Sequence, residues 1–293
     1  MTQTFLAKAG EKRLERFLAA HRAASRKPGE ESVHDLRVAI RRLLAFLDMA
    51  APLVGQGTPF SGTLPETLNR LMKPLGRLRD AHVKTLRIRA MVPLADPVSW
   101  QYALAVQSDT EKWETVADAA LRRTRANRIR AAFRALPFSR PIPDDPEGAM
   151  LDRLRGLEKA LVRDAGVFLA EPSPESLHVF RLAFKTYRYS AEVVGALLPG
   201  RAPEADARLH DFQTLLGDIH DLDVMLAEAR HFREKVLGEK GGMSDVERAA
   251  RKARAESLHR LSRILHNERE VASLFRRDAA ANRTDKRRID VPG

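Results

Sequence analysis

The chain contains no cysteine in its 293 residues, which excludes disulfides, thiol nucleophiles and cysteine-ligated metal sites and is typical of a reducing compartment. Aromatic residues make up only 6% of the chain, so few side chains could stack on nucleic-acid bases. No window approaches about 18 uncharged apolar residues, and the N-terminus lacks the apolar run of a signal peptide. We therefore expect a cytoplasmic protein with no membrane partner.

Strand signals are also almost missing, because β-branched runs and alternating patterns are rare while Ala, Leu, Arg and Glu recur at helical spacing. This pattern predicts an all-α fold with eight helices, the third of which contains Pro74 as a kink. The expected helices cover about residues 4–24, 32–51, 64–91, 97–136, 146–170, 174–198, 203–237 and 244–277.

Two blocks of sequence recur in the same order. Ser32-Val33-His34 aligns with Ser176-Leu177-His178, and Leu75-Gly76-x-x-Arg79-Asp80 aligns with Leu216-Gly217-x-x-His220-Asp221. Two blocks in two sets of four helices indicate an internal duplication, and the architecture predicted is two pseudo-symmetric four-helix bundles. The first four-helix half is expected over residues 1–140 and the second over 141–278, followed by a disordered tail over 279–293.

The net charge of +12 is unevenly distributed. Residues 1–143 hold 25 lysines and arginines against 13 aspartates and glutamates, whereas residues 144–293 hold 26 of each. The whole excess therefore lies in the first half. Such a field raises the local concentration of anions and speeds their capture, although it does not select among them.

The first block places a histidine and two arginines on one side of a helix. Residues three and four positions apart face the same way, so His34, Arg37 and Arg41 form one row, with Arg42 beside it. At about 100° per residue, the apolar residues of the same helix fall on a separate arc. That arc consists of Val33, Leu36, Ile40, Leu43 and Leu47.

The second block repeats this arrangement with His178, Arg181 and Lys185 in the row, while Arg188 and Tyr189 flank it. Arginine can grip two phosphate oxygens with its planar fork, lysine acts as a point charge, and a nearby anion raises the pKa of histidine. Composition and spacing alone therefore indicate a site for a polyanion. The alternatives that involve no ligand are histidines hydrogen-bonded inside a bundle and cations on a solvated face.

The His-x-x-Arg row, the Leu-Gly-x-x-(Arg/His)-Asp block and the duplicated helical layout resemble the CHAD family, named for a conserved histidine α-helical domain. The resemblance extends to about residue 278. It implies paired four-helix bundles that bind inorganic polyphosphate through a basic surface between and across them. It also implies polyphosphate granules as a location for some members. No cofactor, metal or catalytic residue is implied.

Carried onto this chain, the resemblance implies a set of polyphosphate-binding residues in each half. They are His34, Arg37, Arg41, Arg42, Arg79 and His82 in the first half, and His178, Arg181, Lys185, Arg188, Tyr189 and His220 in the second. Leu44 stands where members usually continue the basic row, and Thr186 stands where the first copy has Arg42. The two half-sites are thus unequal, and we expect the His34 row to dominate capture of the anion. Asp80 and Asp221 are expected to hold cations in place.

Six arginines crowd the end of the helix expected over 97–136. Cations near a helix C-terminus interact favourably with its dipole, which is a sufficient structural reason for some of them. They surround the helix, so only part can face one ligand, and Arg122, Arg125 and Arg128 are the candidates for contact with polyphosphate.

Two further functions compete with non-catalytic binding of polyphosphate. A metal-dependent phosphohydrolase is suggested by His34-Asp35, His210-Asp211 and His220-Asp221, but adjacent residues on a helix point about 100° apart and complete no predictable metal pocket. A non-specific nucleic-acid binder would suit the high positive charge, although no recognition motif is visible. Release of phosphate in the presence of Mg²⁺ or Mn²⁺ tests the first alternative, and competition between polyphosphate and DNA tests the second. The oligomeric state stays open.

Overall fold

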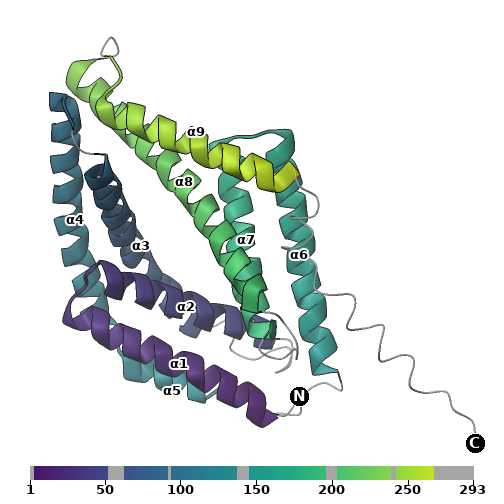
Figure 1. Ribbon diagram of the computed structural model, residues 1–293. Coiled ribbons are helices and arrows are strands. Elements are labelled where there is room, and N and C mark those ends of the chain that lie inside the picture. The colour runs from purple at the N-terminus through teal and green to yellow at the C-terminus, as the bar shows by residue number, and fades with distance from the viewer. Residues whose placement is uncertain are drawn as a thin grey trace, which may run out of the picture.

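The computed structural model describes residues 3–51, 63–91, 94–136, 145–195, 203–238 and 242–266. Within these ranges all regular secondary structure is helical (Figure 1), which confirms the predicted all-α class. The helices are α1 (Gln3–Arg26), α2 (Glu30–Ala50), α3 (Thr63–Ala90), α4 (Pro97–Arg123), α5 (Ala126–Arg134), α6 (Pro146–Ala170), α7 (Pro174–Gly195), α8 (Pro203–Leu237) and α9 (Asp245–His266). The predicted end of the last helix near residue 277 and the tail over 279–293 lie outside the described residues.

The prediction of a single helix over residues 97–136 was wrong, because the helix is interrupted between α4 and α5. Thr124 and Arg125 both have extended backbones, with ψ values of 106° and 91°. The break turns α5 along α1, where Ile129 and Phe133 become 3% and 2% exposed. Helical periodicity runs through the break in the sequence, so only the tertiary burial of these two side chains reveals it. α3, by contrast, continues through Pro74.

The helices of each half pack in the order of the sequence, α1 to α4 in the first and α6 to α9 in the second. α2 of the first half packs against α7 of the second. Their apolar faces belong to one hydrophobic core that spans both halves and includes Val33, Leu36, Ile40, Leu177 and Phe180. The two halves therefore share a core at the α2–α7 contact. Internal duplication stays a prediction, although the same packing order suits it.

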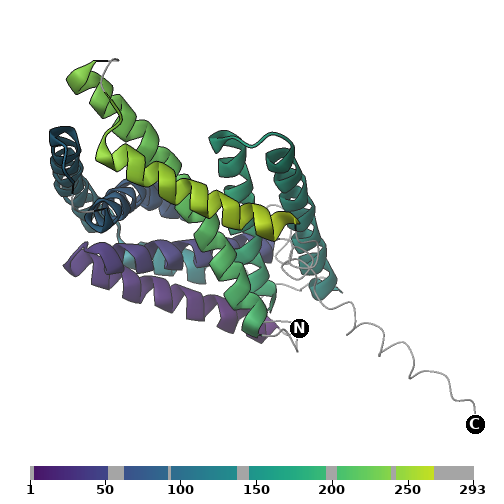
Figure 2. The ribbon, with the colours of Figure 1, turned by 45° about the horizontal axis from the view of Figure 1, so that its top comes forward.

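The α3–α4 and α8–α9 hairpins meet at their loop ends. A second apolar cluster there joins Ile88 and Tyr102 to Met225 and Val246. Figure 2 shows α8 and α9 side by side, extending away from the layer formed by α1 and α2. Among the described residues, α3 and α8 are joined along their length by three ion pairs. Lys84 forms one of them, with its Nζ 2.7 Å from a carboxylate oxygen of α8, and Arg87 forms the other two. The hairpins are thus held together at their tips as well as through α2 and α7.

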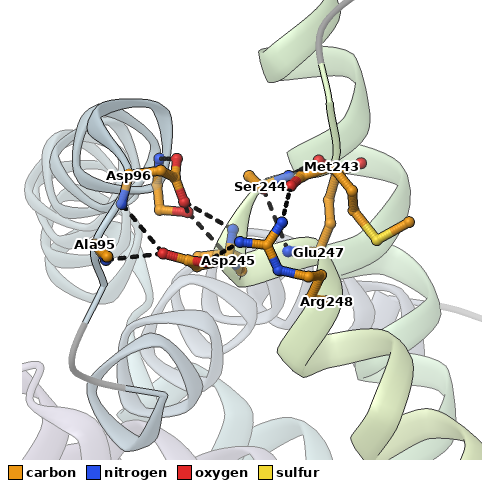
Figure 3. A network of polar contacts seen from close by, with 9 residues as sticks. Ala95, Asp96, Met243, Ser244, Asp245, Glu247 and Arg248 are labelled. Carbon is orange, nitrogen blue, oxygen red and sulfur yellow. Dashed lines mark hydrogen bonds and ion pairs between the residues drawn. The ribbon is translucent and has the colours of Figure 1, made fainter.

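A reciprocal exchange of hydrogen bonds fixes the tip contact (Figure 3). The Asp245 backbone N–H donates to Asp96 Oδ2 at 2.7 Å, and the N–H groups of Ala95 and Asp96 donate to Asp245 Oδ2 at 2.8 and 3.1 Å. Asp96 also caps α4 by accepting from the Ser99 N–H at 2.7 Å. Each aspartate therefore satisfies amide groups of the opposite hairpin, which ties helix capping to the contact between the halves.

None of the described helices is long and apolar enough to cross a membrane.

Candidate anion-binding site

The row predicted on α2 stands beside a buried face that fixes its direction. Leu36 and Ile40 are completely buried, so His34, Arg37 and Arg41 are held at the border between the core and solvent. The Arg37 guanidinium passes over Gly76 of α3, where a Cβ atom would lie 2.9 Å from Arg37 Nη1. The glycine of the Leu-Gly-x-x-Arg-Asp block thus leaves room for an arginine of the row.

The row on α7 is more enclosed. The Arg181 side chain is 14% exposed, and its Nη2 lies 4.0 Å from Asp221 Oδ1 of α8. Arg181 Nε and His178 Nδ1 are buried and have no hydrogen-bond partner within the described residues. The ring of His178 lies 4.7 Å from that of His220 on α8, tilted by 40°. Buried polar atoms are normally satisfied, so these two atoms mark unsatisfied hydrogen-bonding positions beside the row.

The two rows converge because α2 packs against α7. Burial, Arg181 and Arg41 lower the pKa of Lys185 to about 6. Burial and the neighbouring charge of Arg41 likewise lower the pKa of Arg37 to about 10. We call this set the central cationic cluster; its members are His34, Arg37, Arg41, Arg79, His178, Arg181, Lys185 and His220.

The histidines of the cluster are biased toward their neutral form. Burial lowers the pKa of His34, with Arg79 as the next cause, and burial with Arg181 lowers that of His178. Burial and Arg181 lower the pKa of His220 to about 4. Every shift disfavours positive charge, first because of burial and then because of the neighbouring cations. An incoming polyanion would reverse these shifts and relieve the repulsion.

Carboxylates of α3 and α8 contact the cations from one side. Asp221 lies 4.0 Å from both Arg181 and Arg87, and burial raises its pKa. Arg87 Nη2 also lies 2.6 Å from Asp218 Oδ1, which joins α3 to α8. Asp80 interacts electrostatically with Arg37 and Arg181. This arrangement is the one expected of carboxylates that position cations.

Two predicted residues of the first half, Arg42 and His82, are engaged elsewhere, and a third lies at the edge of the cluster. Arg42 Nε lies 2.9 Å from Glu192 Oε1 of α7, and Arg42 lines a cavity of about 520 Å³ between α1 and α2. His82 is 8% exposed, with Nε2 3.6 Å from a carboxylate oxygen of Glu114 on α4. Arg79 stays at the edge of the cluster, where Nη1 donates to Glu30 Oε1 at 3.1 Å.

Other predicted residues also lie apart from the cluster. Tyr189 is 5% exposed, and the Arg188 guanidinium lies 5.2 Å from the centre of its ring. Arg122 is exposed and donates to Asp118 on the same helix at 2.8 Å. Arg125 and Arg128 line a separate cavity beside α3.

Sequence reasoning missed two parts of the site. It named Gly76 as part of a repeat but gave it no role. The close approach of Gly76 to Arg37 can be predicted only when the packing of α2 against α3 is known. It also missed Arg87, whose signal was available: Arg87 lies eight residues after Arg79, only about 80° further round the same helix.

Comparisons with known proteins bear on the family and the fold. The family model of the CHAD domain matches residues 8–230. The crystal structure of the CHAD domain from the plant Ricinus communis superposes with a TM-score of 0.61 at 20% identity, covering 92% of this chain and 91% of that one. PptA from Streptomyces chartreusis gives a TM-score of 0.57 at 18% identity, covering 89% and 95%. No curated protein is significantly similar in sequence. Because the family model spans more than half of its length, the chain belongs to the CHAD domain family.

Proposed function

We propose that this protein binds inorganic polyphosphate without hydrolysing it, and that the central cationic cluster is the binding site. The observation that carries the proposal is the packing of α2 on α7, which brings Arg37 and Arg41 near Arg181 and Lys185. Burial first, and then Arg181 and Arg41, lower the pKa of Lys185 to about 6. Repelling cations kept together on two packed helices lose their repulsion when a polyanion lies between them. Membership of the CHAD family supports the choice of polyphosphate.

The chemistry of the cluster favours an inorganic polymer over a nucleic acid. Its members are arginines, histidines and a lysine, and Tyr189, the aromatic residue predicted to flank the row, is 5% exposed. Binding of single-stranded nucleic acid gains affinity from bases stacked on exposed aromatic rings. A chain of phosphates needs only charge and hydrogen-bond donors, which the arginine forks supply on rigid helices.

The proposal is tested by measuring binding of long-chain polyphosphate at low salt. We expect a submicromolar Kd that rises steeply with salt, because binding releases counterions. Reversing Arg37, Arg41 and Arg181 to Glu together should weaken binding at least about 100-fold, given the strength of charge-assisted hydrogen bonds. Failure of the wild-type protein to bind at low salt would refute the proposal.

A matched control carries the same change of net charge away from the cluster. Arg155, Arg163 and Arg251 are exposed residues of α6 and α9, so their combined reversal to Glu should leave the affinity within a few-fold of the wild type. Far-UV circular dichroism of both triple variants should keep the helical signal. Equal losses in the two variants would mean that only net charge matters and that the cluster is not the site.

The non-catalytic part of the proposal has its own test. Within the described residues no three metal-ligating side chains are grouped together. Incubation of the protein and polyphosphate with Mg²⁺ or Mn²⁺ should release no phosphate, and release that depends on the protein would make it a phosphohydrolase. Binding at polyphosphate granules would follow from the same surface. A fluorescent fusion should locate to granules, and the central triple variant should stay diffuse.

A further inference from the structure

The break between α4 and α5 changes how the arginines of this segment interact with the helix dipoles. Arg122 and Arg123 lie in the last turn of α4, where cations interact favourably with the helix dipole. Arg125, however, is the N-cap of α5, and Arg128 lies in the first turn of that helix. Cations at a helix N-terminus oppose the dipole, and α5 has neither a side-chain cap nor an acidic residue in its first turn. Helix stability does not explain these two arginines.

These arginines line a cleft of about 760 Å³ between α3, α4 and α5, which we call the α5 cleft. Its lining contains four arginines, Arg70, Arg123, Arg125 and Arg128, and no carboxylate. Within the described residues none of the four forms an ion pair. The neighbouring Arg122, by contrast, pairs with Asp118 at 2.8 Å. Four unpaired guanidinium groups around one cavity form a local excess of positive charge that suits an anion.

The α5 cleft is separate from the central cationic cluster. Arg70 and Thr67 of α3 line the cleft, whereas Gly76 and Asp80 of the same helix face the cluster. At about 100° per residue, Arg70 and Gly76 differ by about 120° around α3, and they lie about 9 Å apart along its axis. A ligand in the cleft therefore contacts a different side of α3.

The α5 cleft also has an apolar floor. Leu71 and Ile129 are each 3% exposed and line the cavity together with two alanines. Its volume lies within the range of small-molecule sites, roughly 300–1,000 Å³. Inorganic phosphate chains gain nothing from an apolar floor, whereas a base or another flat ring gains from the floor and from stacked guanidinium planes.

We propose that the α5 cleft is a second anion-binding site, specific for nucleoside polyphosphates. The arginines bind the phosphates, and the base lies on the floor that Leu71 and Ile129 form with the two partly exposed alanines. This site works independently of polyphosphate binding at the central cluster.

ATP is the probe, titrated into the full chain by calorimetry. The variant Arg125→Glu/Arg128→Glu should bind it at least about tenfold more weakly, because charge-assisted hydrogen bonds are lost. The control Arg155→Glu/Arg251→Glu carries the same charge change outside the cleft and should bind within about threefold of the wild type. Equal affinities for the cleft variant and the wild type would overturn the site.

Two further measurements separate the cleft from the cluster and fix the ligand. In Arg181→Glu, ATP binding should stay within about threefold while polyphosphate binding falls, since only the central cluster is changed. Loss of ATP binding in that variant would place ATP at the cluster and overturn the proposal. ATP should also bind at least about fivefold more tightly than inorganic tripolyphosphate, owing to the base contact. Equal affinities would make the cleft a site for inorganic chains and refute nucleotide specificity.

Discussion

Binding of polyphosphate should take up about one proton per protein near pH 8, and Lys185 should be the group that accepts it. The pKa of this amine is lowered to about 6 by burial and by Arg181 and Arg41. At about pH 8 roughly 1% of the free protein therefore carries a charged Lys185, since two pKa units correspond to a 100-fold ratio. Phosphates placed beside the amine raise its pKa again, so the complex holds the proton that the free protein lacks.

The sign and size of the pH effect follow from linkage. Because the complex binds more protons than the free protein, affinity falls as pH rises, by up to about tenfold per pH unit between about pH 7 and pH 9. Interior phosphates of a long chain stay ionised throughout this range, so the titration belongs to the protein. The histidines act lower, near and below about pH 6.5, because their pKa values are lowered as well.

Calorimetry in two buffers of different ionisation enthalpy, such as HEPES and Tris, measures the proton uptake directly. The control is Lys185→Arg, whose guanidinium keeps its charge near pH 8, as Arg37 does with a pKa of about 10 in the same cluster. This variant should bind without proton uptake and lose most of the pH dependence. Uptake that persists in Lys185→Arg, or wild-type binding without uptake near pH 8, would refute the reasoning.

Two further predictions concern single residues. Gly76→Ala places a Cβ 2.9 Å from Arg37 Nη1, which displaces the guanidinium. The variant should bind polyphosphate about tenfold more weakly, because the charge-assisted hydrogen bond between Arg37 and phosphate is lost. At the matching Gly217 a Cβ meets nothing within 4 Å, so Gly217→Ala should keep the affinity and stabilise α8 by about 0.5–1 kcal/mol; equal effects of the two would contradict the role of Gly76. Asp96→Ala should lower the free energy of unfolding by about 1–2 kcal/mol through loss of the α4 cap. Burial raises the pKa of Asp96, but hydrogen bonds from Ser99 and Asp245 outweigh it and lower the pKa to about 2. This stabilisation is present above about pH 4 and lost toward about pH 2, so wild type and variant should converge there in thermal melts.

Local patterns in the sequence were sufficient for the helices and for the two rows. The apolar arc of α2 is buried as expected, and a side chain's position on a helix follows from its spacing alone. The same logic placed Arg181 and Lys185 on one side of α7. His82, which was named from the family resemblance, lies beyond this logic, because a helical wheel gives a direction without saying which neighbouring helix lies there. His82 points to Glu114 of α4.

The sequence by itself determined the helical class, the two cation rows and the excess charge of the first half, because these depend on spacing and composition. Only the tertiary structure decided which cations share a site. Packing of α2 on α7 brings Arg37 to Arg181, and the turn at Thr124 moves Arg125 from the end of one helix to the start of another. Both outcomes depend on which apolar helix faces pack against each other. One hydrophobic pattern is compatible with several such packings, so the pattern alone does not select among them.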